Sequence, residues 1–280
     1  MELHYRIVNV FAREGRLTGN PLCVFEDGSS LDDATMQALA LQFNLSETTF
    51  ILPSSKATAR VRIFTPAYEM PFAGHPTLGT AHVVRAVKGA GDAVALEMKA
   101  GIIPVNAKGD LWTLQAVEPS SRALELTRAE LEEILGLEPG DVGEWPLWVS
   151  AGREQLIVPL TSVDAVRRAS PRADAFARLK SVDGYSMAYV FHDAGEAAGK
   201  VEARFFFPKG PAILEDPATG SACANLGGWF GVVRPRTDIV REVSQGEAVG
   251  RPSTLYLNVS HGAIHVGGRV IDLGRGTLTP

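Results

Sequence analysis

The sequence predicts an α+β protein with two similar halves, and internal similarity is the main reason. Arg62-Ile63-Phe64-Thr65-Pro66 is echoed by Arg204-Phe205-Phe206-Phe207-Pro208, an offset of 142 residues. The same offset pairs Gly74 with Asp216, Thr77 with Thr219 and Ala81 with Cys223. In both halves a strand pattern leads through a proline-containing loop into a helical pattern, which favours duplication over chance. Copies related by a pseudo-twofold axis would place the two loops face to face across a cleft.

The first half reads as strands interrupted by two helices. Extended patterns cover residues 5–11 and 22–25, on either side of a turn that contains Gly19-Asn20-Pro21. Ser30 and Asp33 resemble a capping box, which predicts a helix to about residue 43, and residues 48–52 predict the next strand. Alternation over 57–64 predicts another strand. A helix over about 77–87 and short strands to about 117 complete this half.

The second half begins after a polar stretch. Thr127 and Glu130 form a capping box, and Gly136 lies where a C-terminal cap belongs. Strands are expected over 145–150, 156–160, 185–192 and 201–207, with helical residues to about 180, a helix over 219–232 and closing strands. Trp145 and Trp148 are interpreted as packing residues. The predicted organisation is an N-terminal lobe over 1–118, to which a closing C-terminal strand returns, a crossing segment over 119–144, and a C-terminal lobe over 145–280.

The helix expected over 219–232 carries no charged residue. A helix on the surface would show a polar stripe, so this one should be buried on nearly every side. Its four glycines are poor helix formers. They are better explained if the helix packs closely inside a curved sheet.

Composition excludes several classes of function. The net charge of −5 and the pI near 5.7 leave no basic surface for nucleic acid or anionic membranes. No apolar run approaches the roughly 20 residues that span a bilayer, and the N-terminus does not read as a signal peptide. Two cysteines are too few for a disulfide framework. We therefore expect a reduced, cytoplasmic protein.

Several motifs, taken together, resemble one known family. They are Asn44-Leu45-Ser46-Glu47-Thr48-Thr49-Phe50, Phe64-Thr65-Pro66, Gly74-His75-Pro76-Thr77-Leu78-Gly79 and Glu215-Asp216-Pro217-Ala218-Thr219-Gly220-Ser221-Ala222. Weaker matches are Gly19-Asn20-Pro21, Gln245-Gly246 and Gly250-Arg251-Pro252-Ser253. The combination resembles the PhzF-like isomerases of phenazine biosynthesis and covers almost the whole chain.

The resemblance implies a fold similar to that of diaminopimelate epimerase, in which each of two pseudo-symmetric lobes is a β-barrel-like roll around a central helix. It also implies isomerase-type proton transfer on a small, carboxylated substrate without metal, flavin or nicotinamide, and a homodimer. Diaminopimelate epimerases use one cysteine from each lobe. The matching loops here carry Gly74-His75 and Asp216-Pro217, so a two-thiol epimerase is disfavoured.

The resemblance also transfers a set of site residues to this chain. The catalytic residues are expected to be Glu47, His75 and Asp216. The expected substrate-binding residues are Asn20, Ser46, Gly74, Pro76, Thr77, Gly220 and Ser221. No metal ligand is expected.

The chemistry of these groups suits proton transfer. Glu47 could abstract a proton from carbon if burial raised its pKa, although it also fits a solvated glutamate at a strand start. A neutral His75 could orient Glu47 or relay a proton, whereas His82, seven residues later and inside the helix, is expected to pack in or near the core. Asp216 could contact substrate or cap the helix that follows, and these two roles are compatible.

Backbone amides are the third kind of group expected in the site. Two helix N-termini, near Thr77 and near Gly220-Ser221, would present unpaired N–H groups to one cleft. They would stabilise a substrate carboxylate or the enolate-like charge that develops as a proton leaves.

Three functions stay open at this point. The first is an isomerase that moves a proton between positions through Glu47. The second is a racemase or epimerase, which needs a second base such as Asp216 or His75. The third is a metabolite-binding protein that retains the scaffold without catalysis.

Overall fold

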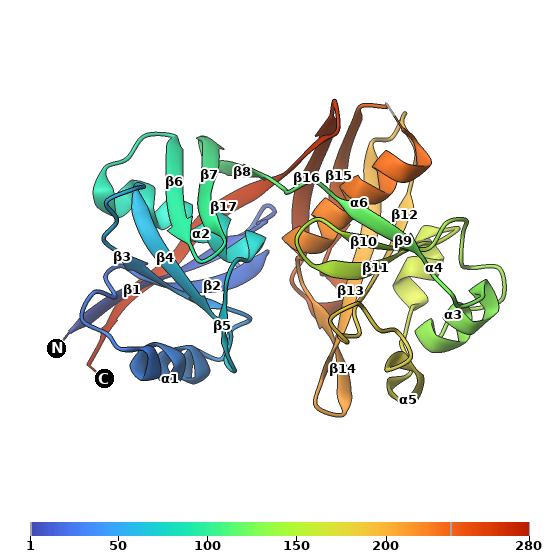
Figure 1. The fold of residues 1–280 in the computed structure, drawn as a ribbon, viewed down its shortest axis with the longest axis horizontal. Coiled ribbons are helices and arrows are strands. Elements are labelled where there is room, and N and C mark those ends of the chain that lie inside the picture. The colour runs from blue at the N-terminus through green and yellow to red at the C-terminus, as the bar shows by residue number, and fades with distance from the viewer. Residues whose placement is uncertain (1, 236, 280) are drawn as a thin grey trace. The chain divides into compact units, whose positions relative to one another are not determined.

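The computed structural model describes residues 2–235 and 237–279, and the chain divides into two compact units. Unit 1 contains Met1–Gln115 and Gly267–Pro280, and unit 2 contains Ala116–Val266. The segment 119–144 thus belongs to unit 2. The last strand, β17 (Ala263–Leu278), begins in unit 2 and continues into unit 1 (Figure 1). Among the described residues, none of the helices combines the length and apolar character needed to cross a membrane.

Unit 1 is a closed barrel. Its strands are β1 (Leu3–Val10), β2 (Asn20–Phe25), β3 (Thr48–Leu52), β4 (Ala59–Phe64), β6 (Ala93–Met98), β7 (Gly101–Lys108), β8 (Leu111–Gln115) and β17. In the described chain these eight strands pair in the order β1-β2-β3-β4-β6-β7-β8-β17, and β17 closes the ring on β1. The β2–β3 and β4–β6 pairs are parallel. A short strand, β5 (Glu69–Met70), pairs with β4 beside the ring.

A helix fills this barrel. α2 (Gly74–Lys88) contacts β1, β2, β3, β4, β6, β7 and β8, and Figure 1 shows it among those strands. The packing is close, because a Cβ atom at Gly79 would lie 2.6 Å from a methyl group of Leu22. A second helix, α1 (Asp33–Phe43), covers the outside of β3 and β4. Strand β2 is therefore apolar on both faces, with Leu22 towards α2 and Cys23 in the cluster under α1.

Two helix starts differ from the sequence prediction. The N-cap of α1 is Asp32, whose side chain accepts from the Thr35 amide, and not Ser30. Helix α2 starts at Gly74, three residues earlier than expected. Pro76 is compatible with this start, because an N–H group in the first helical turn has no intrahelical partner to lose.

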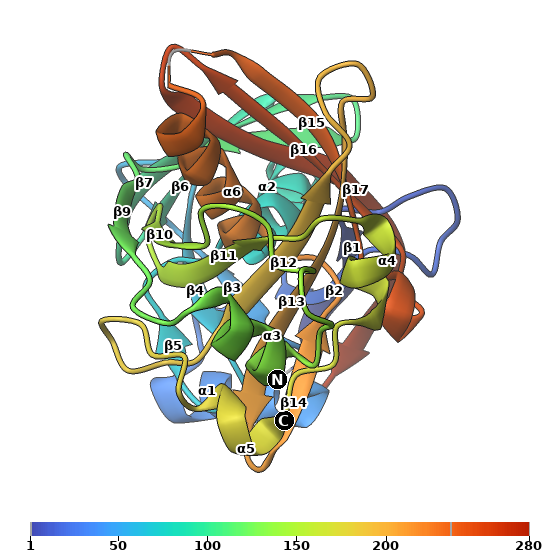
Figure 2. The ribbon, with the colours of Figure 1, turned by 90° about the vertical axis from the view of Figure 1, so that its right-hand side faces the viewer.

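Unit 2 contains β9 (Ser120–Ala123), α3 (Arg128–Leu135), β10 (Leu147–Ser150), β11 (Glu154–Pro159), α4 (Val163–Arg168), α5 (Ala173–Phe176), β12 (Ala188–Asp193), β13 (Lys200–Lys209), β14 (Ala212–Asp216), α6 (Gly220–Val233), β15 (Ile239–Gln245), the 3-10 turn η1 (Glu247–Val249) and β16 (Ser253–Ser260). The strands pair in the order β9-β10-β11-β12-β13-β15-β16. The buried helix α6 contacts β9, β10, β11, β15 and β16, as can be followed in Figure 2.

The two units repeat one topology. In unit 1 the pairs β1–β2, β2–β3, β3–β4, β4–β5 and β4–β6 are antiparallel, parallel, antiparallel, antiparallel and parallel. In unit 2 the pairs β10–β11, β11–β12, β12–β13, β13–β14 and β13–β15 follow the same sequence of directions. Each unit then inserts its long apolar helix at the same point. The predicted α+β fold of two pseudo-symmetric lobes around central helices is confirmed.

The register between the halves changes after the repeated motif. Phe64 pairs with Glu69 in the first hairpin, and Phe206 pairs with Glu215 in the second. The offset therefore increases from 142 to 146 residues, because the β13–β14 hairpin is four residues longer. The pairing of Gly74 with Asp216 was wrong: the counterpart of Gly74 is Gly220, and that of His75 is Ser221, the second residue of each helix.

One three-residue cluster recurs in both hairpins. The Arg62 guanidinium lies 5.0 Å from the Phe64 ring centroid and donates two hydrogen bonds to Glu69. Arg204 lies 4.8 Å from the Phe206 ring and donates two hydrogen bonds to Oε2 of Glu215. These side chains tie the hairpin strands together, and in unit 2 they hold the residue before Asp216.

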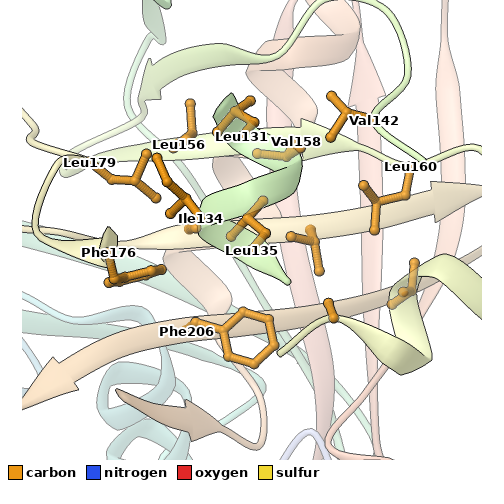
Figure 3. Packing of buried hydrophobic residues seen from close by; sticks show 14 of the residues in the cluster. Leu131, Ile134, Leu135, Val142, Leu156, Val158, Leu160, Phe176, Leu179 and Phe206 are labelled. Atoms are coloured by element: carbon orange, nitrogen blue, oxygen red, sulfur yellow. The ribbon is translucent and has the colours of Figure 1, made fainter. Parts of the chain in front are cut away.

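The outer core of unit 2 lies under α3, α4 and α5. Apolar side chains from these helices meet β11 and β12, as Figure 3 shows for Leu131, Ile134 and Val158. The capping box of Thr127 and Glu130 is confirmed, and Gly136 ends α3 in the left-handed conformation.

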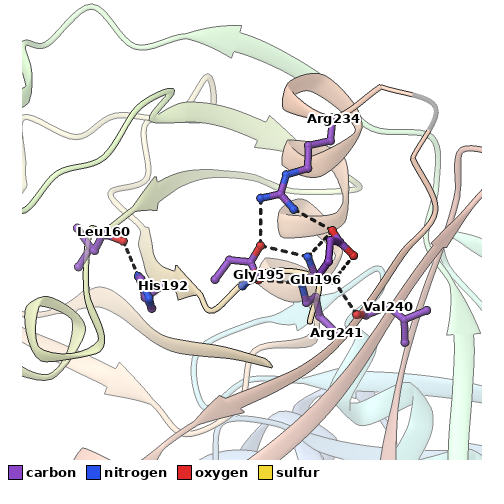
Figure 4. A network of polar contacts seen from close by, with 8 residues as sticks. Leu160, His192, Gly195, Glu196, Arg234, Val240 and Arg241 are labelled. Carbon is purple, nitrogen blue, oxygen red and sulfur yellow. Dashed lines mark hydrogen bonds and ion pairs between the residues drawn. The ribbon is translucent and has the colours of Figure 1, made fainter. Parts of the chain in front are cut away.

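The end of α6 is held by charged groups. The buried Arg241 donates to both Asp193 and Glu196, and Arg234 also pairs with Glu196 (Figure 4). The expectation for Trp145 was wrong, since its side chain is 62% exposed on a residue with φ of 64°, whereas Trp148 is buried.

Candidate active site

A carboxylate and an imidazole meet at the N-terminus of α2. Glu47 immediately precedes β3, and its Oε2 lies 3.0 Å from Nδ1 of His75, the second residue of α2. The Glu47 side chain is 17% exposed and that of His75 is 6% exposed. The fold thus brings together two of the three predicted catalytic residues, which are 28 positions apart in sequence.

The hydrogen bond defines which imidazole nitrogen carries the proton. An ionised carboxylate accepts only, so Nδ1 of His75 donates to Glu47. In the neutral ring this leaves Nε2 as an acceptor, and Nε2 is buried without a hydrogen-bond partner among the described residues. His75 can therefore orient the Glu47 carboxylate and exchange a proton with it.

Asp216, the third predicted catalytic residue, ends β14 in unit 2. Its Oδ2 accepts a 2.5 Å hydrogen bond from the hydroxyl of Thr219, the N-cap of α6. The amide of Gln245 in turn donates to the Thr219 hydroxyl at 3.0 Å and to the Asp216 carbonyl at 2.8 Å. Gln245, which sequence reasoning did not single out as a site residue, fixes the loop that carries Asp216.

A glycine makes this loop contact possible. Gly246 has φ of 84°, and a Cβ atom there would clash with the carbonyl oxygens of Pro217 and Arg251. Residues with a Cβ disfavour this backbone conformation. The loop after β15 therefore packs directly on the backbone of the Asp216 loop.

The helix N-termini differ from expectation at Thr77. Its hydroxyl donates to the Ala73 carbonyl at 2.6 Å, its amide also bonds Ala73, and the residue is fully buried. Thr77 is thus committed to the helix and offers no group to a ligand. The amides without intrahelical partners are those of the first turn, at Gly74 and His75 in α2 and at Gly220 and Ser221 in α6. Pro76 has no amide proton to offer.

The other predicted binding residues lie in contrasting surroundings. Asn20 begins β2 and is almost fully buried, in register with Val10 on β1. Ser46 is exposed beside Glu47. Ser221 is partly buried at the start of α6, where its hydroxyl accepts from the Gln155 side chain at 3.0 Å.

Gln155 and Asn225 were missed by sequence reasoning. Asn225 lies in the middle of α6 and donates to Gln155 at 2.8 Å, so the two amides form a buried chain that ends at Ser221. A signal was present in the sequence, because Asn225 is a side-chain amide in the middle of a helix made largely of small and apolar residues.

The cysteines and His82 do not belong to this site. Cys23 and Cys223 are fully buried, and burial raises the pKa of both thiols. His82 packs near Trp112 inside unit 1, and burial lowers its pKa despite the neighbouring Asp272. In the described part of the chain, no group of three or more His, Cys, Asp or Glu side chains is arranged to hold a metal ion.

Two units of one topology, each built around a buried helix, define the diaminopimelate epimerase-like fold. The family model described as phenazine biosynthesis-like protein (PhzC-PhzF) matches residues 8–273, and the chain belongs to this family. It is 35% identical to an uncharacterised isomerase of Pasteurella multocida, covering 98% of this chain and 93% of that one. It is 32% identical to trans-2,3-dihydro-3-hydroxyanthranilate isomerase of Pseudomonas fluorescens, covering 98% and 99%. The protein is therefore an isomerase of the PhzF-like family.

Solved structures agree on the fold. A PhzF-family phenazine biosynthesis protein from Bacillus anthracis superposes with a TM-score of 0.86 at 23% identity, with 100% of each chain covered. A hydroxyproline epimerase from Agrobacterium vitis gives a TM-score of 0.60 at 12% identity, covering 99% of this chain and 92% of that one. The architecture is thus shared with epimerases as well as with the PhzF family.

Proposed function

We propose that this protein is a cofactor-independent isomerase that removes a proton from a carbon atom of a small carboxylated metabolite and returns it at another position. Glu47 is the base in this proposal, His75 orients it and shares its proton, and Asp216 contacts the substrate. The observation that carries the proposal is the 3.0 Å contact between Glu47 and His75. A carboxylate held in this way, and screened from most of the solvent, is suited to general base catalysis.

Unit 2 contributes groups that stabilise charge. The first-turn amides of α6 and the hydroxyl of Ser221 are hydrogen-bond donors, and donors of this kind favour an oxyanion that forms as a proton leaves carbon. Within unit 2, we propose that Asp216 and Ser221 contact the substrate.

The asymmetry of the duplication favours proton migration over epimerisation. Thr48 pairs with Phe64 in unit 1, and Ala188 pairs with Phe206 in unit 2, so the counterpart of Glu47 is Met187. The counterpart of His75 is Ser221. Within the described part of unit 2 the acid–imidazole pair is therefore not repeated, whereas a two-base epimerase needs a second base opposite the first.

Substitution of Glu47 tests the proposal. With trans-2,3-dihydro-3-hydroxyanthranilate as the probe, the substrate named for the Pseudomonas relatives, Glu47→Gln should lower kcat by about 10²-fold to 10⁴-fold, because the amide cannot take the proton. The thermal unfolding temperature should stay unchanged. The matched control is Glu125→Gln, an exposed carboxylate in unit 2, which should keep full activity. Full turnover by Glu47→Gln would reject Glu47 as the base.

The position of the label distinguishes the alternatives. In deuterated water, a migrating proton places deuterium at a new carbon of the probe, whereas epimerisation labels the original stereocentre. Tight binding of the probe without any exchange would instead identify a binding protein. Activity should survive dialysis against a chelator, as expected for a cofactor-independent enzyme.

We also propose a homodimer, which the resemblance to PhzF-like isomerases supports. Sedimentation velocity at micromolar concentration should show a species of twice the 29.9 kDa chain mass. A single species at the mass of one chain would contradict this part of the proposal.

A further inference from the structure

We infer that Gln155 and Asn225 are positioning residues, which hold the Ser221 hydroxyl as a hydrogen-bond donor towards the substrate. The inference rests on the proposed function, in which Ser221 contacts the substrate. It adds that the Ser221 hydroxyl is the hydrogen-bond donor in that contact. It depends on a chain of hydrogen bonds whose polarity is set at one end by the backbone.

The chain starts at two backbone groups whose roles cannot change. The amide of Ala151 is a donor, and it bonds Oδ1 of Asn225 at 2.6 Å. The carbonyl of Arg153 is an acceptor, and it receives Nδ2 of Asn225 at 2.9 Å. The oxygen and the nitrogen of the Asn225 side chain are therefore assigned by chemistry.

The polarity passes from Asn225 to Ser221. Nδ2 of Asn225 donates its second hydrogen to Oε1 of Gln155 at 2.8 Å, so the other end of that amide must be Nε2. Nε2 of Gln155 then donates to Oγ of Ser221 at 3.0 Å. The hydroxyl of Ser221 is consequently an acceptor towards the protein.

The hydrogen of Ser221 is left for another group. A hydroxyl that accepts one bond still has its O–H to donate. Among residues 2–235 and 237–279 no acceptor receives it, and the side chain is partly open to solvent at the second residue of α6. The O–H is therefore available to a ligand atom that accepts, such as a carboxylate or enolate oxygen.

Burial fixes the orientation of the Asn225 and Gln155 amides. Asn225 is fully buried and Gln155 is 2% exposed. A buried amide that turned over would leave a donor facing a donor, which is costly in a water-excluded site. The amides thus keep one orientation, which leaves the Ser221 O–H directed away from Gln155.

The equivalent helix of unit 1 holds its second residue differently. At the matching position of α2, His75 is held by the ionisable Glu47, whereas Ser221 is held by two neutral amides. Glu47 and His75 can exchange a proton, whereas the neutral amides have no proton to exchange and can only orient Ser221. The two helix tips have therefore taken complementary tasks.

A double-mutant cycle tests the positioning role. On the probe trans-2,3-dihydro-3-hydroxyanthranilate, Gln155→Leu should lower kcat by about 10-fold to 50-fold, because a Ser221 hydroxyl that is no longer held loses its hydrogen bond to a charged substrate oxygen. In a Ser221→Ala background the same substitution should change kcat by less than about twofold, because its target is gone. Tyr189→Phe, a fully buried residue of the same unit, is the matched control and should keep kcat. Fully additive losses would overturn the inference.

Reversing the polarity gives a second readout that a purely structural role would not move. In Gln155→Glu the ionised carboxylate accepts from Ser221 and draws its hydrogen away from the substrate. The activity relative to the unsubstituted protein should therefore rise as pH falls, because a protonated carboxyl can donate again. A ratio that is constant with pH would contradict the inference.

Neutron diffraction from a deuterated crystal tests the geometry without any substrate. The map should place deuterium on Gln155 Nε2 facing Ser221, and the Ser221 deuterium directed elsewhere. A Ser221 deuterium directed at Gln155 would overturn the inference, even if Glu47→Gln had confirmed the base. Conversely, an active Glu47→Gln variant would reject the proposed base while the neutron result stood.

Discussion

The two cysteines share one physical state although they lie in different units. Cys23 is on β2 under α1, and Cys223 is on α6, and neither has measurable exposure. Burial raises the pKa of each thiol, since a thiolate without water or a nearby cation is disfavoured. A thiol in this state is neither a base nor a nucleophile.

Thiol labelling should show this directly. We expect no alkylation of the native protein by iodoacetamide at pH 8, because both thiols are protonated and inaccessible. In 6 M guanidinium chloride both should be labelled, as counted by intact-protein mass spectrometry. Rapid labelling of either cysteine in the folded protein would restore a thiol-based mechanism for consideration.

Tyr189 places a polar hydroxyl group in the interior of unit 2. Its hydroxyl has no hydrogen-bond partner among the described residues, and burial, together with the neighbouring Cys223, raises its pKa. An unpaired buried hydroxyl destabilises the folded state.

Removing this hydroxyl should therefore stabilise the protein. We expect Tyr189→Phe to raise the free energy of unfolding by about 1 kcal/mol in urea titrations. The matched control is Thr49→Val, which deletes a buried hydroxyl that pairs with Thr80 at 2.8 Å and should lose about 1 to 3 kcal/mol. Equal losses in both variants would show that the Tyr189 hydroxyl has a partner in solution.

Loops as well as strands position the residues of the candidate site. The loop after β15 reaches the Asp216 loop through Gln245 and Gly246. At Gly246 the positive φ and the close backbone approach both exclude a side chain, whereas Gly250 has a similar φ of 68° and open space around it.

Alanine substitutions at these two glycines distinguish the cost of the backbone conformation from the cost of a steric clash. Gly246→Ala should cost about 2 to 4 kcal/mol of unfolding free energy and should reduce kcat, because Pro217 and with it Asp216 must move. Gly250→Ala should cost about 1 to 2 kcal/mol, the value of the backbone conformation alone, and should leave kcat unchanged. Equal effects of both substitutions on kcat would argue against a link between this loop and Asp216.

Glu69, in the hairpin of β4 and β5, makes the stability of the folded protein depend on pH. The hydrogen bond from Arg62, with a further one from Lys99, holds the pKa of Glu69 below its ordinary value although partial burial opposes the shift. Because the folded pKa is depressed, the stabilisation is fully present above the unfolded pKa of about 4.3 and is lost as pH falls through the folded pKa.

Unfolding free energies measured between pH 6 and pH 3 should reveal this contribution. The unsubstituted protein should lose stability as pH falls below about 4, and Glu69→Gln should flatten that decline because it removes the titrating group. Glu2→Gln, at an exposed position of unit 1, is the control and should keep the original slope. An unchanged slope in Glu69→Gln would mean that other carboxylates dominate acid unfolding.

The last strand closes the barrel of unit 1. β17 pairs with β1 from Val10–Val270 to Leu3–Leu278, and it also pairs with β8. It lies tightly on β8, because a Cβ atom at Gly267 would be 2.6 Å from the Thr113 hydroxyl. Without β17, two strand edges and the apolar helix α2 would be open to solvent.

Truncation should therefore act on the whole of unit 1. In a chain that lacks residues 267–280, we expect the amides of β1 to β8 to exchange with deuterium within seconds, as followed by mass spectrometry of peptides. A chain that lacks residues 279–280 should keep full protection. Retained protection in the shorter chain would show that the barrel does not depend on β17.

The sequence determined those features that arise from contacts between near neighbours. The capping box of Thr127 and Glu130 and the glycine cap at Gly136 were predicted correctly, because each interaction spans a few residues. The burial of α6 followed from its lack of charge, and the duplication followed from the Arg-Phe motif, which lies in equivalent strands. The family motifs then placed Glu47 and His75 in one predicted site.

Tertiary structure decided what depends on distant segments. The extra four residues of the β13–β14 hairpin changed the match between the halves and made Ser221 the counterpart of His75, which only the strand register reveals. The chain from Asn225 through Gln155 to Ser221 joins residues about 70 positions apart, and Gln245 reaches Asp216 across 29. Such contacts exist because strand pairing brings the segments together, and local sequence patterns do not encode which distant strands will pair.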